Sequence, residues 1–302
     1  NEGALEQRFS PRVWHRWLAR LAHRRNDNTK RGSRRNIAYH YDLGNAFYRE
    51  WLDAGMTYSS ALFDSPDQPL AAAQENKNRA ILDLLQVQPH ERVLEIGCGW
   101  GGLGEQLLQT QPVSWHGVTL SQEQLSWTQQ RLAPFATRAQ ATLTDYRDLT
   151  TQYDRIVSVE MLEAVGEAHW PRYFQTLKRC LKPGGTAVLQ VITIDESRFE
   201  GYRRGCDFIQ RYVFPGGMLP TATAIRQQAE AAGLTLDHRF PFGSHYASTL
   251  THWRQAFNRR WDAIAPLGFD ERFRRLWNFY LCYCESGFRH GAIDVQLFRL
   301  RH

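Results

Sequence analysis

Residues 94 to 102 read LEIGCGWGG, and the glycines at positions 97, 99 and 102 follow the G-x-G-x-x-G spacing of dinucleotide-binding loops. Glycine suits a turn between a strand and a helix because it tolerates left-handed backbone angles and has no side chain to keep a ligand away. The spacing alone is a weak indicator, since any ligand that must approach the backbone closely favours it. The residues on either side of the loop decide which ligand is expected.

Helix and strand patterns alternate on both sides of this loop. Apolar runs of strand length are separated by amphipathic stretches of helix length, which is typical of a doubly wound parallel α/β sheet. We expect helices over 71–85, from 102 onward, over 121–133 and over 170–181, strands at 92–96, 114–120, within 141–149, within 154–162 and at 186–194, and a turn at 182–185. Ligands of such sheets bind at the carboxyl ends of the strands.

The sequence disfavours a nicotinamide site. The second expected strand ends in Thr119-Leu120-Ser121, without the acidic residue that a dinucleotide fold places about 20 residues after its glycines. The ordered set E-x-G-x-G-x-G from Glu95, T-x-S from Thr119, D-Y-R-D from Asp145 and a Leu-Lys-Pro-Gly-Gly turn resembles the class I S-adenosylmethionine methyltransferases. That resemblance implies a Rossmann-like, seven-stranded, mostly parallel sheet with S-adenosylmethionine at the glycine loop.

Longer motifs, from about Tyr39 to the C-terminus, resemble the cyclopropane fatty acid synthase family. They are HYDLGNAFYREWLD, MTYSSALF, RVLEIGCGWGG, GVTLS, DYRDL, DRIVSVEMLEAVG, FIQRYVFPGGMLP and FYLCYCESGF. The family transfers the methyl group of S-adenosylmethionine to a cis double bond of an unsaturated phospholipid acyl chain. The resemblance implies that the cofactor is held by Tyr58, Ser59, Glu95, Gly97, Cys98, Gly99, Thr119, Gln124, Asp145 and Tyr146.

The same family binds a bicarbonate ion as the base that removes a proton after methyl transfer. Its catalytic ligands correspond here to Glu163, the backbone of Ile192, and Tyr280, whereas Ser60 and Gln190 stand where the family has Cys and His. Ser and Gln can still donate hydrogen bonds to an anion, but Gln cannot titrate. Two questions therefore stay open: whether bicarbonate binds, and whether the product is a cyclopropane, a methyl-branched chain or a methylene-branched chain.

The reaction also indicates what else the site needs. An alkene is a weak nucleophile, so methyl transfer leaves a carbocation that a dry apolar cavity and one well-held base would stabilise and then deprotonate. We expect Glu163 to hold the proton-accepting anion or to be the base itself. Glu160, three residues earlier, suits a structural or capping role as well as a catalytic one.

The predicted domain organisation has two parts. Residues 1–36 form a basic amphipathic helix and a linker, and residues 37–302 form the methyltransferase domain. Aromatic-rich insertions near 196–230 and 245–290 interrupt the sheet between its fifth, sixth and seventh strands, and we expect them to cap the acyl chain. No metal site is indicated, because the five cysteines are scattered and lack neighbouring histidines.

The positive charge of the chain is concentrated near its start. The net charge is +6, and residues 8 to 35 hold ten Lys or Arg against one Asp. Two interpretations stay open: a helix docked on the body with a solvated Arg face, or attachment to an anionic membrane surface. No nucleic-acid recognition module follows, so we expect no nucleic-acid partner. With no apolar run of about 18 residues and no signal segment, we expect a cytoplasmic protein, peripheral at the inner face of the membrane.

Two further functions are alternatives to a lipid methyltransferase. Alkaloid N-methyltransferases share motifs such as HYDLGN, so a soluble amine is an alternative substrate. A lipid-binding subunit that lost activity with the Cys and His is another, although the complete glycine loop argues against it. The oligomeric state, with a homodimer as one alternative, and the residues that precede Asn1 stay undetermined from the sequence.

Overall fold

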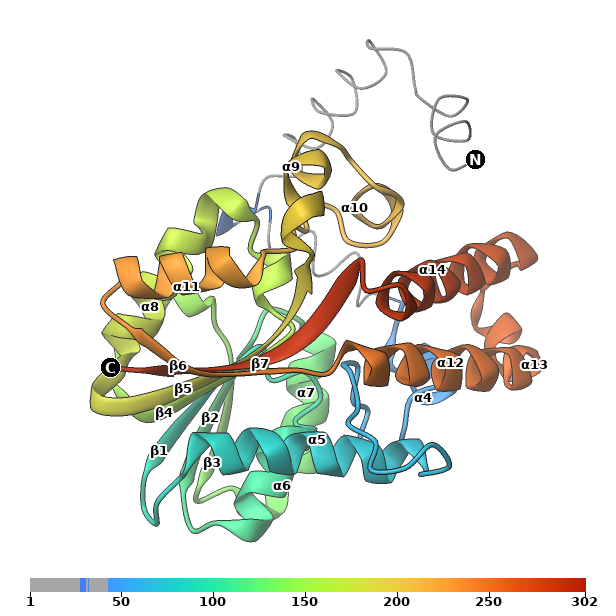
Figure 1. Ribbon diagram of the computed structural model, residues 1–302. Coiled ribbons are helices and arrows are strands. Elements are labelled where there is room, and N and C mark those ends of the chain that lie inside the picture. Colours follow the sequence, from blue (N-terminus) through green and yellow to red (C-terminus); the bar gives the residue numbers. More distant parts are fainter. Residues whose placement is uncertain (1–27, 31, 33–42) are drawn as a thin grey trace.

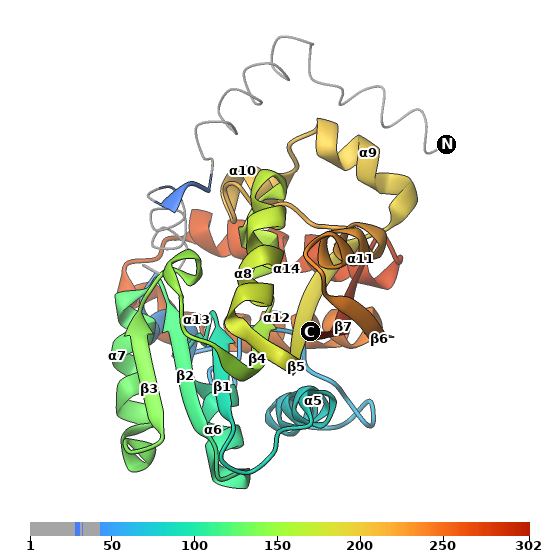
Figure 2. The ribbon, with the colours of Figure 1, turned by 90° about the vertical axis from the view of Figure 1, so that its left-hand side faces the viewer.

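A seven-stranded sheet forms the centre of the computed structural model, which describes residues 28–30, 32 and 43–302. Its order is β3-β2-β1-β4-β5-β7-β6, which Figure 2 shows from left to right. All neighbouring strands are parallel except at β7, which is antiparallel to both β5 and β6. The strands are β1 (Arg92–Ile96), β2 (Ser114–Thr119), β3 (Ala139–Leu143), β4 (Tyr153–Val159), β5 (Leu181–Ile194), β6 (Thr235–Pro241) and β7 (Ile293–Arg301). The predicted seven-stranded, mostly parallel sheet is confirmed.

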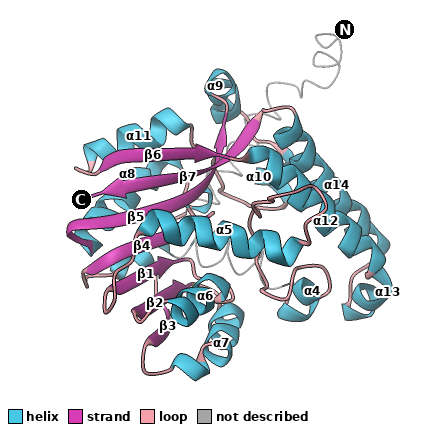
Figure 3. Cartoon of the chain, turned by 60° about the horizontal axis from the view of Figure 1, so that its bottom comes forward, coloured by secondary structure: helices cyan, strands magenta, loops and turns pink. Residues whose placement is uncertain are grey.

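Helices cover both faces of the sheet, as its parallel strands require. α5 (Leu70–Leu85), α6 (Gly102–Thr110) and α7 (Gln122–Arg131) lie on one face (Figure 3), and α8 (Trp170–Cys180) and α11 (Ala222–Ala231) on the other (Figure 1). Strand β1 shows the reason for this arrangement. Val93 belongs to the hydrophobic cluster under α5 and α6, whereas its neighbour Leu94 belongs to the cluster under α8 and α11.

The remaining helices gather beyond the carboxyl ends of the parallel strands (Figure 1). They are α4 (Asn45–Arg49), α9 (Glu196–Arg204), α10 (Phe208–Tyr212), α12 (Gly243–Arg259), α13 (Trp261–Ile264) and α14 (Glu271–Arg289). Short 3-10 helices cover Ala133–Phe135, Tyr146–Asp148, Leu162–Ala164, Glu167–His169 and Ala265–Leu267. The first expected insertion, near residues 196–230, contributes only α9 and α10 to this group. Its last helix, α11, packs against α8 and β6 instead.

The expected turn at 182–185 lies inside β5. Tyr153 pairs with Leu181, but Arg155 pairs with Thr186, so the extra residues loop out of the ladder, with Gly184 at a φ of 78°. The predicted basic helix and linker lie outside the described residues, except for 28–30 and 32, and stay a prediction. Within the described part of the chain, no helix has the length and apolar character needed to cross a bilayer.

Candidate functional site

The glycine loop joins β1 to α6 and leaves its backbone accessible. Gly97 and Gly99 adopt left-handed angles, with φ values of 80° and 52°. A Cβ atom added to Gly99 would meet no heavy atom within 4 Å, whereas one added to Gly97 would lie 3.1 Å from Cγ of Met161. Open space therefore lies beside Gly99, as a cofactor that rests on the backbone requires.

The other expected cofactor residues at β1 and β2 are held by protein partners. Glu95 accepts a hydrogen bond of 2.9 Å from Nε1 of Trp115, and Thr119 donates one of 2.8 Å to Oε1 of Gln124. Burial raises the pKa of Glu95 to about 8. These buried side chains shape the strand ends, and Cys98 is buried beside them.

Asp145 and Tyr146 follow β3 as expected, but the carboxylate of Asp145 is bound by Arg147. The guanidinium donates from Nε and Nη2 over 2.8 and 2.7 Å, and both side chains are buried. Burial alone would raise the pKa of Asp145, but the hydrogen bonds from Arg147 hold it below its usual value. Arg147 also donates to the carbonyl oxygen of Asn28, whose side chain binds the carbonyl of Gly216.

Tyr58 and Ser59 lie in the loop before α5, where a buried lysine binds Ser59. Nζ of Lys77 donates to Oγ of Ser59 over 3.0 Å, and Gln74 donates to the Ser59 carbonyl over 2.8 Å. Burial lowers the pKa of Lys77 to about 8, against the opposing attraction of nearby carboxylates, Glu160 first. None of the sequence motifs points to Lys77 as a site residue, although its place four residues from Ala73 and Ile81, on the apolar stripe of a helix, is a usable signal.

The two glutamates after β4 form the centre of the site. Oε1 of Glu160 accepts hydrogen bonds from the backbone N–H of Ser60 over 2.9 Å and from Nε2 of Gln190 over 2.7 Å. Oε2 accepts from the hydroxyl of Tyr246 over 2.6 Å. Glu163 accepts from the backbone N–H of Ile192 through Oε1, while its buried Oε2 has no partner among the described residues.

Electrostatics make the two carboxyl groups unequal. Burial raises the pKa of Glu163 to about 8, and the nearby charge of Glu160 adds to the rise. Burial also raises the pKa of Glu160, but its three hydrogen bonds favour the ionised form. Glu163 therefore holds a proton more tightly than Glu160, and Glu160 is the more readily ionised member of the pair.

The residues expected to hold bicarbonate do not fit that ion. The backbone N–H groups of Ser60 and Ile192 and the side-chain amide of Gln190 already bind carboxylates of the protein, and the Ser60 hydroxyl donates to the carbonyl oxygen of Ala61. The remaining expected ligand, Tyr280 on α14, shares a hydrogen bond of 2.9 Å with the hydroxyl of Tyr58. A free anion would have to displace Glu160 or lie beside its charge, which is unfavourable in a buried site.

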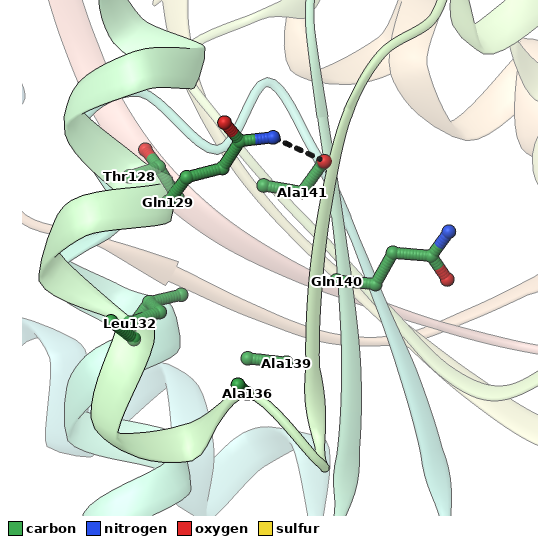
Figure 4. Close-up of a pocket in the computed structure, with 8 residues that line it drawn as sticks. Thr128, Gln129, Leu132, Ala136, Ala139, Gln140 and Ala141 are labelled. Atoms are coloured by element: carbon green, nitrogen blue, oxygen red, sulfur yellow. Dashed lines mark hydrogen bonds between the residues drawn. The ribbon is translucent and has the colours of Figure 1, made fainter.

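A shallow hollow between α7 and β3 is separate from these groups (Figure 4). It is lined by Thr128, Gln129, Leu132, Ala133, Ala136, Ala139, Gln140 and Ala141. None of these side chains titrates, and Gln129 binds the carbonyl of Ala141 over 3.4 Å. Within residues 28–30, 32 and 43–302, no group of three or more His, Cys, Asp or Glu could hold a metal ion.

A substitution in the glycine loop tests the open space beside Gly99. We expect Gly99→Val to weaken binding of S-adenosylmethionine at least tenfold in calorimetry, because the new side chain enters that space. Gly184→Val is the matched control, since Gly184 is also left-handed and its Cβ would also meet nothing within 4 Å. Equal affinities in the Gly99 variant and the wild type would show that the cofactor lies elsewhere.

Comparison with known proteins agrees with this geometry. The model of the mycolic acid cyclopropane synthetase family matches residues 28–298. The tuberculostearic acid methyltransferase UfaA1 of Mycobacterium tuberculosis is 45% identical over 281 residues, covering 89% of this chain and 65% of that protein. The cyclopropane-fatty-acyl-phospholipid synthase of Escherichia coli K12 is 39% identical over 261 residues, covering 86% and 65%.

A solved structure extends the likeness to the fold. The crystal structure of mycolic acid cyclopropane synthase CmaA1 complexed with SAH and CTAB matches with a TM-score of 0.84 at 31% identity, covering 89% of this chain and 98% of that one. The chain spans 65% of the length of the two curated relatives named above. The resemblance drawn from the motifs is confirmed, and the chain belongs to the mycolic acid cyclopropane synthetase family.

Proposed function

We propose that this chain is an S-adenosylmethionine-dependent methyltransferase that acts on cis double bonds in phospholipid acyl chains. One observation carries the proposal. A glycine loop with open space beside it lies at the same end of the sheet as two buried carboxyl groups, each held by hydrogen bonds from the surrounding chain. The named activities of the relatives support the same reaction. A buried anion next to apolar side chains suits a reaction whose intermediate is a carbocation.

Each part of the site has a task in this reaction. When bound, S-adenosylmethionine supplies an electrophilic methyl group. The glycine loop positions the cofactor through its backbone, and Ser59, held by Lys77, completes the wall on the α5 side. The Tyr58 ring packs 5.2 Å from that of Trp253 and 5.5 Å from that of Trp51, which excludes water from this wall. The carboxyl pair then stabilises positive charge on the acyl chain and accepts the proton.

The aromatic residues of the two insertions divide into a packed group and an exposed group. Trp253 and Phe257 are fully buried and pack on Trp51 and on Phe47 of α4, so they support the fold. The second group, which we call the aromatic patch, consists of exposed Tyr212, Phe279 and Tyr283 with half-buried Phe208, on α10 and α14. The rings of Phe208 and Phe279 lie 4.7 Å apart, and 54% of Phe279 is exposed.

The aromatic patch supports a membrane surface as a partner. Exposed aromatic rings with adjacent cations are typical of proteins that lie on anionic lipid, and Arg211 and Arg275 are exposed on the same two helices. The chain would then act as a peripheral protein at the cytoplasmic face, taking its acyl chain from the bilayer. The basic N-terminal segment, outside the described residues, would add further attraction.

Vesicle binding tests the aromatic patch. We expect the double substitution Phe279→Ser and Tyr283→Ser to lower partitioning onto phosphatidylglycerol vesicles at least tenfold, because it removes apolar surface that would be buried in the membrane. A factor of ten requires a loss of only about 1.4 kcal/mol of binding free energy. Phe240→Ser is the control, since Phe240 is 40% exposed but lies on the edge strand β6. Unchanged sedimentation of the double variant with vesicles would assign membrane contact to another surface.

The proposed reaction is tested by its product. The full chain is expressed in a host that lacks acyl methylation and is fed methionine with a deuterated methyl group, and its fatty acids are analysed by mass spectrometry. We expect chains that are one carbon heavier and carry the label. Label found only in a small amine, or in no product, would favour one of the two alternative functions.

A further inference from the structure

Three parts of the fold that are distant in sequence direct hydrogen-bond donors at one carboxylate. Ser60 lies before α5, Gln190 on β5 and Tyr246 on α12, and each donates to Glu160. Ser60, Gln190 and Tyr246 are all buried. This convergence is the pattern of a bound anion, but the anion belongs to the chain itself.

The backbone conformation of Glu160 is strained. Its φ is 49°, in the left-handed region that side-chain-bearing residues rarely adopt. Strained residues of this kind persist where the surrounding structure fixes them, and they gather at functional sites. Glycine would adopt the same angle freely, so the carboxylate, and not the turn, accounts for glutamate here.

Charge around Glu160 also fits a resident anion. Lys77 is buried on α5, and its ammonium and Glu160 attract each other. A protonated Glu163 is neutral, so it does not repel the negative charge of Glu160. Oε2 of Glu160 accepts a single hydrogen bond, so it keeps a lone pair that can receive a proton.

We infer that Glu160 is a built-in carboxylate that replaces a free bicarbonate ion as the proton acceptor of the reaction. The inference rests on the proposed function. After methyl transfer, a C–H bond of the cationic acyl chain breaks, and its electron pair closes either a C–C bond of a ring or a C=C bond. The proton passes to Glu160, which becomes a neutral carboxylic acid and returns the proton to water through Glu163 before the next turnover.

Bicarbonate dependence provides the test. The full chain is assayed with unsaturated phospholipid vesicles and labelled S-adenosylmethionine in buffer freed of carbon dioxide, with and without added bicarbonate. We expect the wild-type rate to change less than twofold and Glu160→Gly to lose at least 100-fold, the scale for removing a general base. Combining Glu160→Gly with Ser60→Cys and Gln190→His should create a site whose activity depends on added bicarbonate.

Two controls separate the outcomes. His90→Gly relieves the same kind of strain at an exposed residue with a φ of 66° and should leave the rate unchanged. Carbon-13 bicarbonate, followed by NMR, should bind the triple variant but not the wild type, whatever the activity. A wild type that binds or requires bicarbonate, or an active Glu160→Gly without it, overturns the inference while the proposed function stands. A wild type that transfers no methyl to lipid overturns the proposed function itself.

Discussion

Glu163→Gln is expected to lower turnover by a factor of about 100 to 10,000, the range for loss of a group that takes part in proton transfer. The amide oxygen can still accept the hydrogen bond from Ile192, so the local backbone contact is retained. What the amide cannot do is gain or lose a proton. With a pKa raised to about 8, the wild-type carboxyl group can exchange protons with its neighbour Glu160 near neutral pH.

Multiple-turnover transfer of labelled methyl to lipid measures this effect. Affinity for S-adenosylmethionine should stay within about twofold of the wild type, because a neutral isostere leaves the glycine loop intact. Glu167→Gln is the matched control, since Glu167 lies four residues later and pairs with Arg203 at the surface. Turnover of the Glu163 variant close to the wild-type rate would remove Glu163 from the proton-transfer machinery.

Arg147→Met is expected to lower the free energy of unfolding by about 3 to 5 kcal/mol, the usual effect of leaving one member of a buried ion pair without its partner. Only 4% of the Arg147 side chain and none of the Asp145 side chain is exposed. The substitution also removes the bond to the Asn28 carbonyl, which ties residue 28 to this end of the sheet. Methionine fills similar volume, so the lost charge dominates the effect.

Urea unfolding followed by fluorescence measures this loss. Arg204→Met is the control: the Arg204–Glu200 pair is 70% and 59% exposed, and such pairs contribute below about 1 kcal/mol. The lowered pKa of folded Asp145 contributes stability above its unfolded pKa, and that stability is lost as pH falls through the folded pKa. The wild type should therefore lose more stability than the variant on acidification. Equal urea midpoints for Arg147→Met and Arg204→Met would contradict the assignment.

The sheet and the glycine loop could be predicted because their signals are local. Strand length, helix periodicity and the spacing of Gly97 and Gly99 each lie within a few residues, and the order of the motifs gave the topology. The Asp145-Tyr146-Arg147 run was equally visible. Its ion pair was not, because it depends on the 3-10 turn that folds Arg147 back onto the carboxylate.

The candidate site was only partly predictable because its contacts are distant in sequence. Glu160 is separated from Ser60 by 100 residues, from Gln190 by 30 and from Tyr246 by 86. The substitutions at Ser60 and Gln190 indicated a changed anion site, but nothing in the sequence showed what fills it. Tyr246 lies in a segment expected to cap the acyl chain, and the packing of α12 against α14 and β7 brings its hydroxyl to Glu160.

The place of β7 in the sheet sets an order of assembly during synthesis. β6 ends the sheet and pairs with β7 alone among the described strands, and β7 is made after all of α9 to α14. Strands β1 to β4 and the glycine loop can therefore join while the ribosome is still translating the helices beyond the strand ends. β6 has no strand to pair with until β7 emerges and inserts beside β5. The two strands that then pair are distant in sequence: Arg301 of β7 lies more than 100 residues after its partner Thr186 of β5. Such distant pairing is slow, so we expect a nascent chain that can bind its cofactor well before it can hold a lipid.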